Sequence, residues 1–199
     1  GWIAAARCIE MRGPFLNEDH RMNYAASDRR DKFRIAATNP AKLKLARQLA
    51  TRHSEDHILF IGQYLDQLEE ASTVLEAPLI TGKTPQDKRN KLYDQFKKGE
   101  IPRLVVSKVA NFAVDLPDAN VAIQLSGTFG SRQEEAQRLG RILRPKSDGS
   151  CALFYSVVTA GSRDQEFAEK RQLFLTEQGY TYEITEAAAM SSAENGVCS

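Results

Sequence analysis

Metal-binding and membrane-spanning patterns are missing from this 199-residue sequence. The three cysteines, Cys8, Cys151 and Cys198, lie far apart, and none of the three histidines is spaced from them as a second ligand. This argues against a zinc site built on neighbouring ligands. No apolar run reaches the length of a membrane helix, and no secretory signal is recognisable, so we expect a cytoplasmic protein without a membrane partner.

A strong charge of one sign is also missing, since the net charge is +1 at pH 7. The molecule as a whole is therefore not an evident polyanion binder. The charges are nevertheless segregated: residues 29–52 carry eight Lys or Arg and one Asp, residues 83–98 carry six and two, and residues 55–76 carry six acids and no base. Such faces are usually just solvated, but the basic ones are also compatible with a nucleic-acid track.

A complete nucleotide-binding loop is absent as well. Thr81-Gly82-Lys83-Thr84 contains the GKT of a P-loop, but Ala77 stands where the full pattern requires Gly, and residues 78–80 read as a strand. No D-E-x-H or D-E-A-D run occurs. The groups that hold Mg²⁺ and the β,γ-phosphates in P-loop enzymes are therefore not encoded here, which disfavours a P-loop kinase.

What is present is an alternation of short apolar runs with amphipathic helices. Unalternated apolar strands of this kind are typical of a parallel sheet covered on both faces, so we predict an α/β fold, a three-layer RecA-like sheet. Strands are expected at 57–61, 78–81, 103–107, 121–125 and 151–158, and helices at 39–52, 65–75, 84–98, 131–143 and 162–178. We expect an N-terminal arm over 1–38, with a possible strand at 2–11 and a helix at 18–33, then a domain over 39–184 and a disordered tail over 185–199.

In such sheets ligands gather at the carboxyl ends of the strands. These ends carry small or polar residues: Gly62-Gln63, Thr81-Gly82, Ser107-Lys108 and Ser126-Gly127.

The predicted helix over 131–143 has an unusual polar face. Ser131 and Glu134 form a capping-box pattern, and Pro145 ends the helix. At about 100° per residue, Gln137, Arg141 and Arg144 fall within roughly 60° of arc, opposite an apolar face. Glu134 can pair with Arg138, whereas Arg141 and Arg144 have no such local acid. Adjacent guanidiniums of this kind suit a phosphate cluster; a solvated face is the alternative.

These residues carry a family resemblance. Gln137 to Arg144, QRLGRILR, resembles the QRxGRxxR motif VI of superfamily 2 helicases, and 130–145 is similar to the version in XPB-type DNA helicases. Three further stretches resemble helicase motifs in the same order: 58–62 (motif IV), the G-x-x-x-Q-x-x-R stretch from Gly82 to Arg89, and 107–117 (motif V). Ala113 and Leu143 stand where many members have Gly, as in the XPB subgroup.

The resemblance implies the second RecA-like lobe of a prokaryotic, ATP-dependent 3'-to-5' DNA helicase or translocase in DNA repair and duplex opening. It implies that ATP and Mg²⁺ are held mainly by a first lobe outside this sequence, so that this segment alone is inactive. Implied partners are DNA, that first lobe and repair proteins such as a nuclease, in the nucleoid region of the cytoplasm. A non-catalytic nucleic-acid-binding or scaffold module of the same fold is the alternative.

The resemblance also implies site residues. Arg141 and Arg144 correspond to the catalytic arginine fingers, and Gln137, Asp115 and Arg138 to nucleotide-binding positions. Arg138 is equally suited to pairing with Glu134, and Asp115 to capping a turn. The implied nucleic-acid contacts are Ser107, Lys108, Gly62, Thr81, Gly82 and Arg89.

Overall fold

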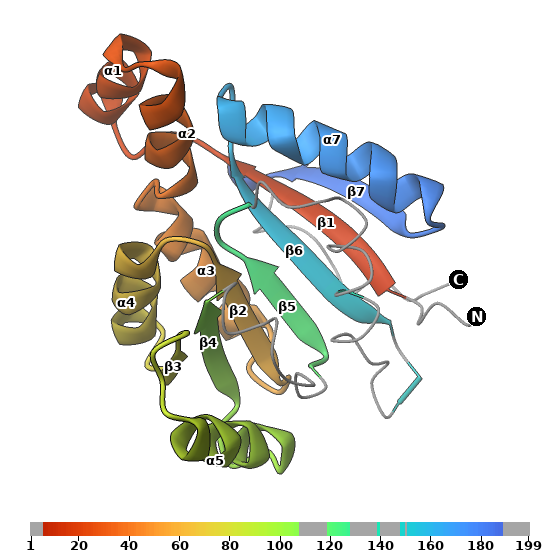
Figure 1. Cartoon of the computed structure of the whole chain (residues 1–199). Helices are drawn as coiled ribbons and strands as arrows, with labels where there is room; N and C mark the ends of the chain where they lie inside the picture. Colours follow the sequence, from red (N-terminus) through yellow and green to blue (C-terminus); the bar gives the residue numbers. More distant parts are fainter. Residues whose placement is uncertain (1–5, 108–118, 128–138, 140–147, 150, 189–199) are drawn as a thin grey trace.

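The fold is seen in a computed structural model that describes residues 6–107, 119–127, 139, 148–149 and 151–188. Seven parallel strands form one twisted sheet in the order β3-β4-β2-β5-β6-β1-β7 (Figure 1). The strands are β1 (Ala6–Gly13), β2 (Ile58–Gly62), β3 (Leu79–Ile80), β4 (Arg103–Ser107), β5 (Val121–Gln124), β6 (Ala152–Thr159) and β7 (Thr181–Glu186).

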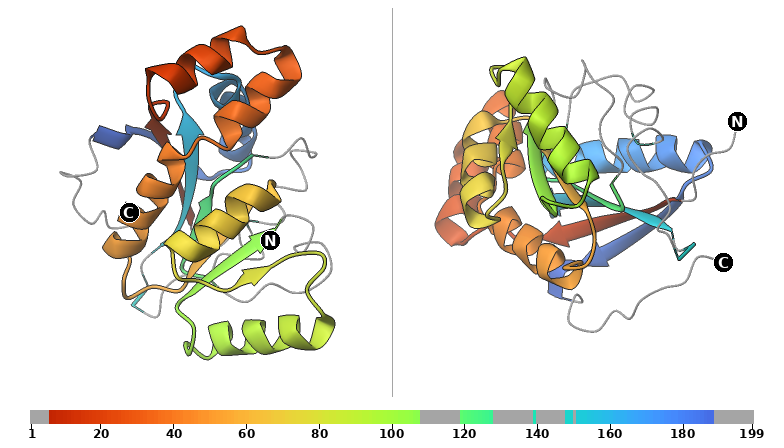
Figure 2. Two further views of the ribbon diagram at one scale, coloured as in Figure 1. Left: turned by 90° about the vertical axis from the view of Figure 1, so that its left-hand side faces the viewer. Right: turned by 90° about the horizontal axis from the view of Figure 1, so that it is seen from below.

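Helices cover both faces of the sheet (Figure 2). They are α1 (Glu18–Ala26), α2 (Arg29–Ala37), α3 (Ala41–Arg52), α4 (Leu65–Val74), α5 (Gln86–Lys97) and α7 (Arg163–Glu177). Alternate residues of β2 show the two faces: Ile58 and Phe60 are buried with α3 and α4, whereas Leu59 and Ile61 are buried with α5. Leu175 of α7 packs on the same side as α5, over β6 and β1. The predicted three-layer α/β fold is confirmed.

The apolar runs did not predict β7, and β1 was expected only as a possible strand at 2–11. β1 lies between β6 and β7, so residues 6–13, which we expected in an arm, belong to the sheet. Its pattern mixes apolar and charged residues because Glu10 is fully buried beside Arg12, whose Nε donates to Glu10 Oε2 at 2.9 Å. Burial raises the pKa of the Glu10 carboxyl, and Arg12 opposes that shift. The edge strand β7 extends past the predicted domain boundary at residue 184.

Capping side chains set the starts of some helices, among them α2 and α7. The expected helix over 18–33 is two helices, because the Asp28 carboxylate accepts hydrogen bonds from the backbone N–H groups of Arg30 and Asp31 and starts α2. Ser162 caps α7 in the same way, and Gly179, with φ of 89°, follows its end. Of the predicted helix over 131–143, only Leu139 is described, and it is buried beside Ala122 and Phe154 as its apolar face requires.

The described part of the chain contains no helix that is both long and apolar enough to cross a membrane. Within the same residues there is no cluster of three or more metal-ligating side chains.

Candidate nucleic-acid interface

Four predicted strand ends meet at one edge of the sheet. The order β3-β4-β2-β5 places Thr81, Ser107, Gly62 and Ser126 along neighbouring strands, and Gly62 is in register with Ser107. The backbone N–H of Gln63 donates to Ser126 Oγ at 2.7 Å, which ties the end of β2 to the end of β5. Parallel pairing therefore brings together the small and polar groups expected to meet a ligand.

Gly62 is required at this edge by close packing. A Cβ at this position would lie 2.7 Å from Leu68 Cδ2 of α4 and 3.1 Å from Ser126 Oγ. The predicted backbone contact at Gly62 thus coincides with a point where Leu68 of α4 lies so close that it must move to admit any side chain.

We expect Gly62→Ala to destabilise the fold by about 1–3 kcal/mol, because Leu68 must leave its rotamer to make room for the added methyl group. Urea denaturation of the chain measures this loss. In a double-mutant cycle, Leu68→Ala combined with Gly62→Ala should cost less than the sum of the two single changes. Additive losses would show that Leu68 is not the obstacle.

The turn after β3 is held from within. The backbone N–H of Thr81 donates to Thr84 Oγ1 at 2.9 Å, and Arg89 Nη2 donates to the carbonyls of Thr81 and Thr84 at 3.2 and 3.3 Å. Arg89 is 7% exposed, so its described contacts order the turn, while Gly82 and Lys83 are exposed on it. Helix α5 begins only at Gln86. The GKT sequence therefore forms a turn that side-chain hydrogen bonds hold together, and it does not lead directly into a helix as a P-loop does.

Ser107, the last residue of β4, is 7% exposed. Its contact with a nucleic-acid phosphate stays a prediction, as do those of Gly62, Thr81, Gly82 and Arg89. The remaining predicted site residues lie outside the described residues: Lys108, Asp115, Gln137, Arg138, Arg141 and Arg144.

A buried ion pair behind the edge was not predicted. Lys42, in the first turn of α3, places its Nζ 2.6 Å from Asp164 Oδ2 and 2.8 Å from the Leu125 carbonyl oxygen. The same Asp164 oxygen accepts the Thr159 N–H at 3.0 Å. Burial lowers the pKa of the Lys42 ammonium, and Asp164 acts against that shift. The pair joins α3, α7 and the ends of β5 and β6, so it fixes the backbone on which this edge is built.

Solved structures share this architecture. The chain superposes on the C-terminal domain of the DEAD-box protein Dbp5 with a TM-score of 0.69 and 12% identity, covering 94% of this chain and 93% of that one. It superposes on the E. coli DEAD-box protein SrmB with a TM-score of 0.63 and 17% identity, covering 90% of each chain. The fold is therefore that of a RecA-like helicase C-terminal domain.

The family follows from the sequence comparisons. The family model described as ERCC3/RAD25/XPB C-terminal helicase matches residues 1–198. The chain belongs to this family, as the motif resemblance predicted.

Relatives from several organisms match nearly the whole chain. It is 52% identical to the DNA 3'-5' helicase XPB of Mycobacterium tuberculosis, over 94% of this chain and 34% of that protein. It is 37% identical to a putative DNA 3'-5' helicase Rad25 of Halobacterium salinarum, over 90% of this chain and 29% of that protein. Against the general transcription and DNA repair factor IIH helicase/translocase subunit XPB/SSL2 of Saccharomyces cerevisiae, identity is 34%, over 92% of this chain and 22% of that protein. The chain thus spans no more than about a third of the length of these curated relatives.

Proposed function

We propose that this chain is the second motor lobe of an ATP-dependent DNA helicase or translocase that moves 3' to 5' and opens duplex DNA during repair. The observation that carries the proposal is the match to the XPB-type C-terminal helicase family along residues 1–198. The row of strand ends from Thr81 to Ser126 supports it, because such an edge is where α/β sheets bind their ligands.

The residues divide into two groups in this proposal. Arg141 and Arg144 stabilise negative charge on the transferring phosphoryl group, and Gln137, Asp115 and Arg138 contact the nucleotide. The DNA backbone is contacted by Ser107, Lys108, Gly62, Thr81, Gly82 and Arg89. Hydroxyl, ammonium and backbone N–H groups are the common partners of phosphate oxygens.

ATP and Mg²⁺ supply the energy and the charge neutralisation of phosphoryl transfer when they are bound. The GKT turn does not fit as the phosphate-binding loop of such a site, since Thr84 Oγ1 and Arg89 close it. We therefore assign the phosphate-binding loop and the metal ligands to a first RecA-like lobe of the full-length protein. DNA, that lobe and repair proteins such as a nuclease are the proposed partners, in a nucleoid-associated cytoplasmic setting.

The test compares the full-length protein with this chain alone. We expect the full-length protein to hydrolyse ATP when DNA is present and to displace a strand from a duplex with a 3' tail in preference to one with a 5' tail. We expect the 199-residue chain alone to show no ATP hydrolysis. Rapid turnover by the isolated chain, or unwinding only from a 5' tail, would contradict the assignment. DNA binding without any ATP hydrolysis by the full-length protein would favour the non-catalytic module.

A further inference from the structure

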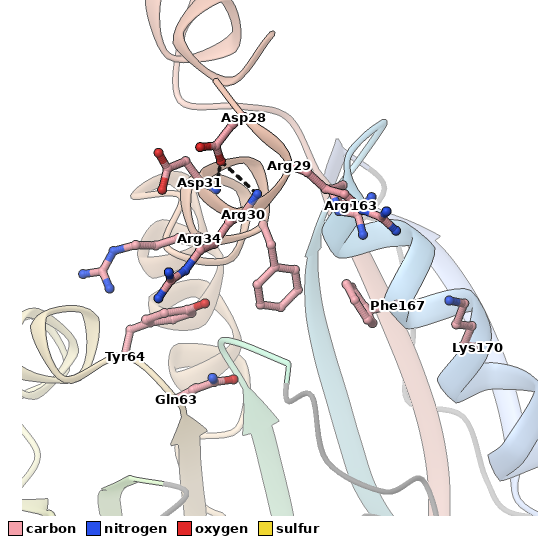
Figure 3. Close-up of a pocket in the computed structure, with 11 residues that line it drawn as sticks. Asp28, Arg29, Arg30, Asp31, Arg34, Gln63, Tyr64, Arg163, Phe167 and Lys170 are labelled. Atoms are coloured by element: carbon pink, nitrogen blue, oxygen red, sulfur yellow. Dashed lines mark hydrogen bonds between the residues drawn. The ribbon is translucent and has the colours of Figure 1, made fainter. Parts of the chain in front are cut away.

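A basic pocket lies beside the strand ends, on elements that carry none of the four helicase motifs. It is bounded by α2, by the residues that follow β2 and by the first turns of α7 (Figure 3). Its volume is about 910 Å³, which is within the range of ligand sites in proteins. It is lined by five cations, two acids, three aromatic rings and an amide: Arg29, Arg30, Arg34, Arg163, Lys170, Asp28, Asp31, Phe33, Tyr64, Phe167 and Gln63.

The formal charge of this lining is +3, from five cationic and two anionic side chains, although Arg34 pairs with Asp66 and Arg163 with Glu166, both outside the lining. The Asp28 carboxylate is already occupied by the N-terminus of α2. Among the described residues, Arg29, Arg30 and Lys170 form no ion pair, and Arg163 Nε is buried without a hydrogen-bond partner. Like charges gathered from separate elements lower the stability of the compact state. An anionic ligand would remove this repulsion and use the donors that remain.

Aromatic rings stand between the cations. Phe33 and Phe167 meet edge to face, with centroids 4.9 Å apart. Arg34 lies 4.9 Å from the Tyr64 ring centroid, and Lys170 lies 5.5 Å from that of Phe167. Cations interleaved with rings are the pattern by which proteins hold single-stranded nucleic acid, because unpaired bases offer faces for stacking while phosphates meet the cations. Duplex bases would not reach the rings, and a free phosphate would not need them.

The pocket is continuous with the candidate interface. Gln63 lines it and directly follows Gly62, and the Gln63 N–H is bonded to Ser126 Oγ. We propose that this basic pocket holds a single strand of DNA after it leaves the strand ends of β2 and β5, with its phosphates on Arg30 and Lys170 and its bases against Tyr64 and Phe167. The inference rests on the proposed function, because it extends the DNA track of the same domain onto α2 and α7.

The test measures how oligothymidylate binding by the full-length protein depends on salt. Each of Arg30→Gln and Lys170→Gln should weaken binding and reduce the slope of log K against log salt by about 0.7, and the double variant by about 1.4. The matched control is Lys44→Gln, an exposed lysine of α3 outside the pocket, which should leave the slope unchanged. The melting temperature of the pocket variants should be unchanged or higher, a result that a structural role for these side chains would not give.

Each other outcome overturns the inference. If the variants keep the salt slope of the unmodified protein and still hydrolyse ATP and unwind DNA, the pocket assignment is refuted and the proposed function stands. If the unmodified protein neither hydrolyses ATP nor unwinds DNA, the proposed function itself is refuted. Binding of inorganic phosphate or of polyglutamate that both variants lose, with DNA slopes intact, would assign the pocket instead to a free anion or to an acidic protein partner.

Discussion

Replacing Arg141 or Arg144 by alanine in the full-length protein is expected to slow ATP hydrolysis by roughly 10³-fold or more, with DNA affinity largely retained. The two guanidiniums share one face of the predicted helix over 131–143 with Gln137 and have no local acid to neutralise them. Arginines positioned on a transferring phosphoryl group are typically worth about 10³–10⁵ in rate. Steady-state ATP hydrolysis with saturating DNA, measured beside equilibrium DNA binding, gives both quantities.

Arg47→Ala is the matched control, since Arg47 is exposed on α3 and is not among the predicted nucleotide- or DNA-binding residues. Its rate should equal that of the unmodified protein. The opposite pattern at Arg141 and Arg144, with DNA affinity lost and hydrolysis unchanged, would mean that these arginines bind nucleic acid and that the non-catalytic module is the better description.

The second large effect is expected at Lys42. Replacing it by methionine should destabilise the chain by about 3–5 kcal/mol, because Asp164 would be left as a buried and unpaired carboxylate. Both side chains are nearly inaccessible, with 2% and 5% exposed. For a slope of about 2 kcal/mol/M, the urea midpoint should fall by about 1.5–2.5 M.

The double variant Lys42→Met with Asp164→Asn separates charge from packing. It removes both charges and keeps an oxygen that can accept the Thr159 N–H, so it should recover a substantial part of the lost stability. If the double variant is as unstable as the sum of the single variants, the ion pair is not the reason for the loss.

Much of the sheet could be predicted because its central strands are buried on both faces. Strands such as Arg103–Ser107 are short apolar runs, and the structure places this one at the predicted residues. β7 was not predicted, and β1 was expected only as a possible strand at 2–11, because their charged residues are paired inside the sheet. Arg7 of β1 contacts Glu183 of β7, and the Tyr182 hydroxyl lies 3.3 Å from Glu10 Oε1. A local pattern cannot reveal that a charge will find its partner in another strand.

The candidate site could also be predicted only in part. The strand ends could be located because the carboxyl edge of a parallel sheet follows directly from the strand assignments. Lys42 was counted in a basic surface segment, since a lysine in a helix is usually solvated and its partner Asp164 is 122 positions away in the sequence. The basic pocket was missed for a similar reason: its cations come from α2 and α7, which become neighbours only when β6 and β1 pair.

The two edge strands of the sheet, β3 and β7, also bear on whether copies of this chain would pair with one another. β3 pairs through only two residues, and β7 carries Glu183 and Glu186 along a largely accessible strand. An edge strand that is very short or negatively charged is a poor template for pairing with a strand of another molecule. Within the part of the chain that the structure describes, neither edge strand therefore favours self-association by strand pairing.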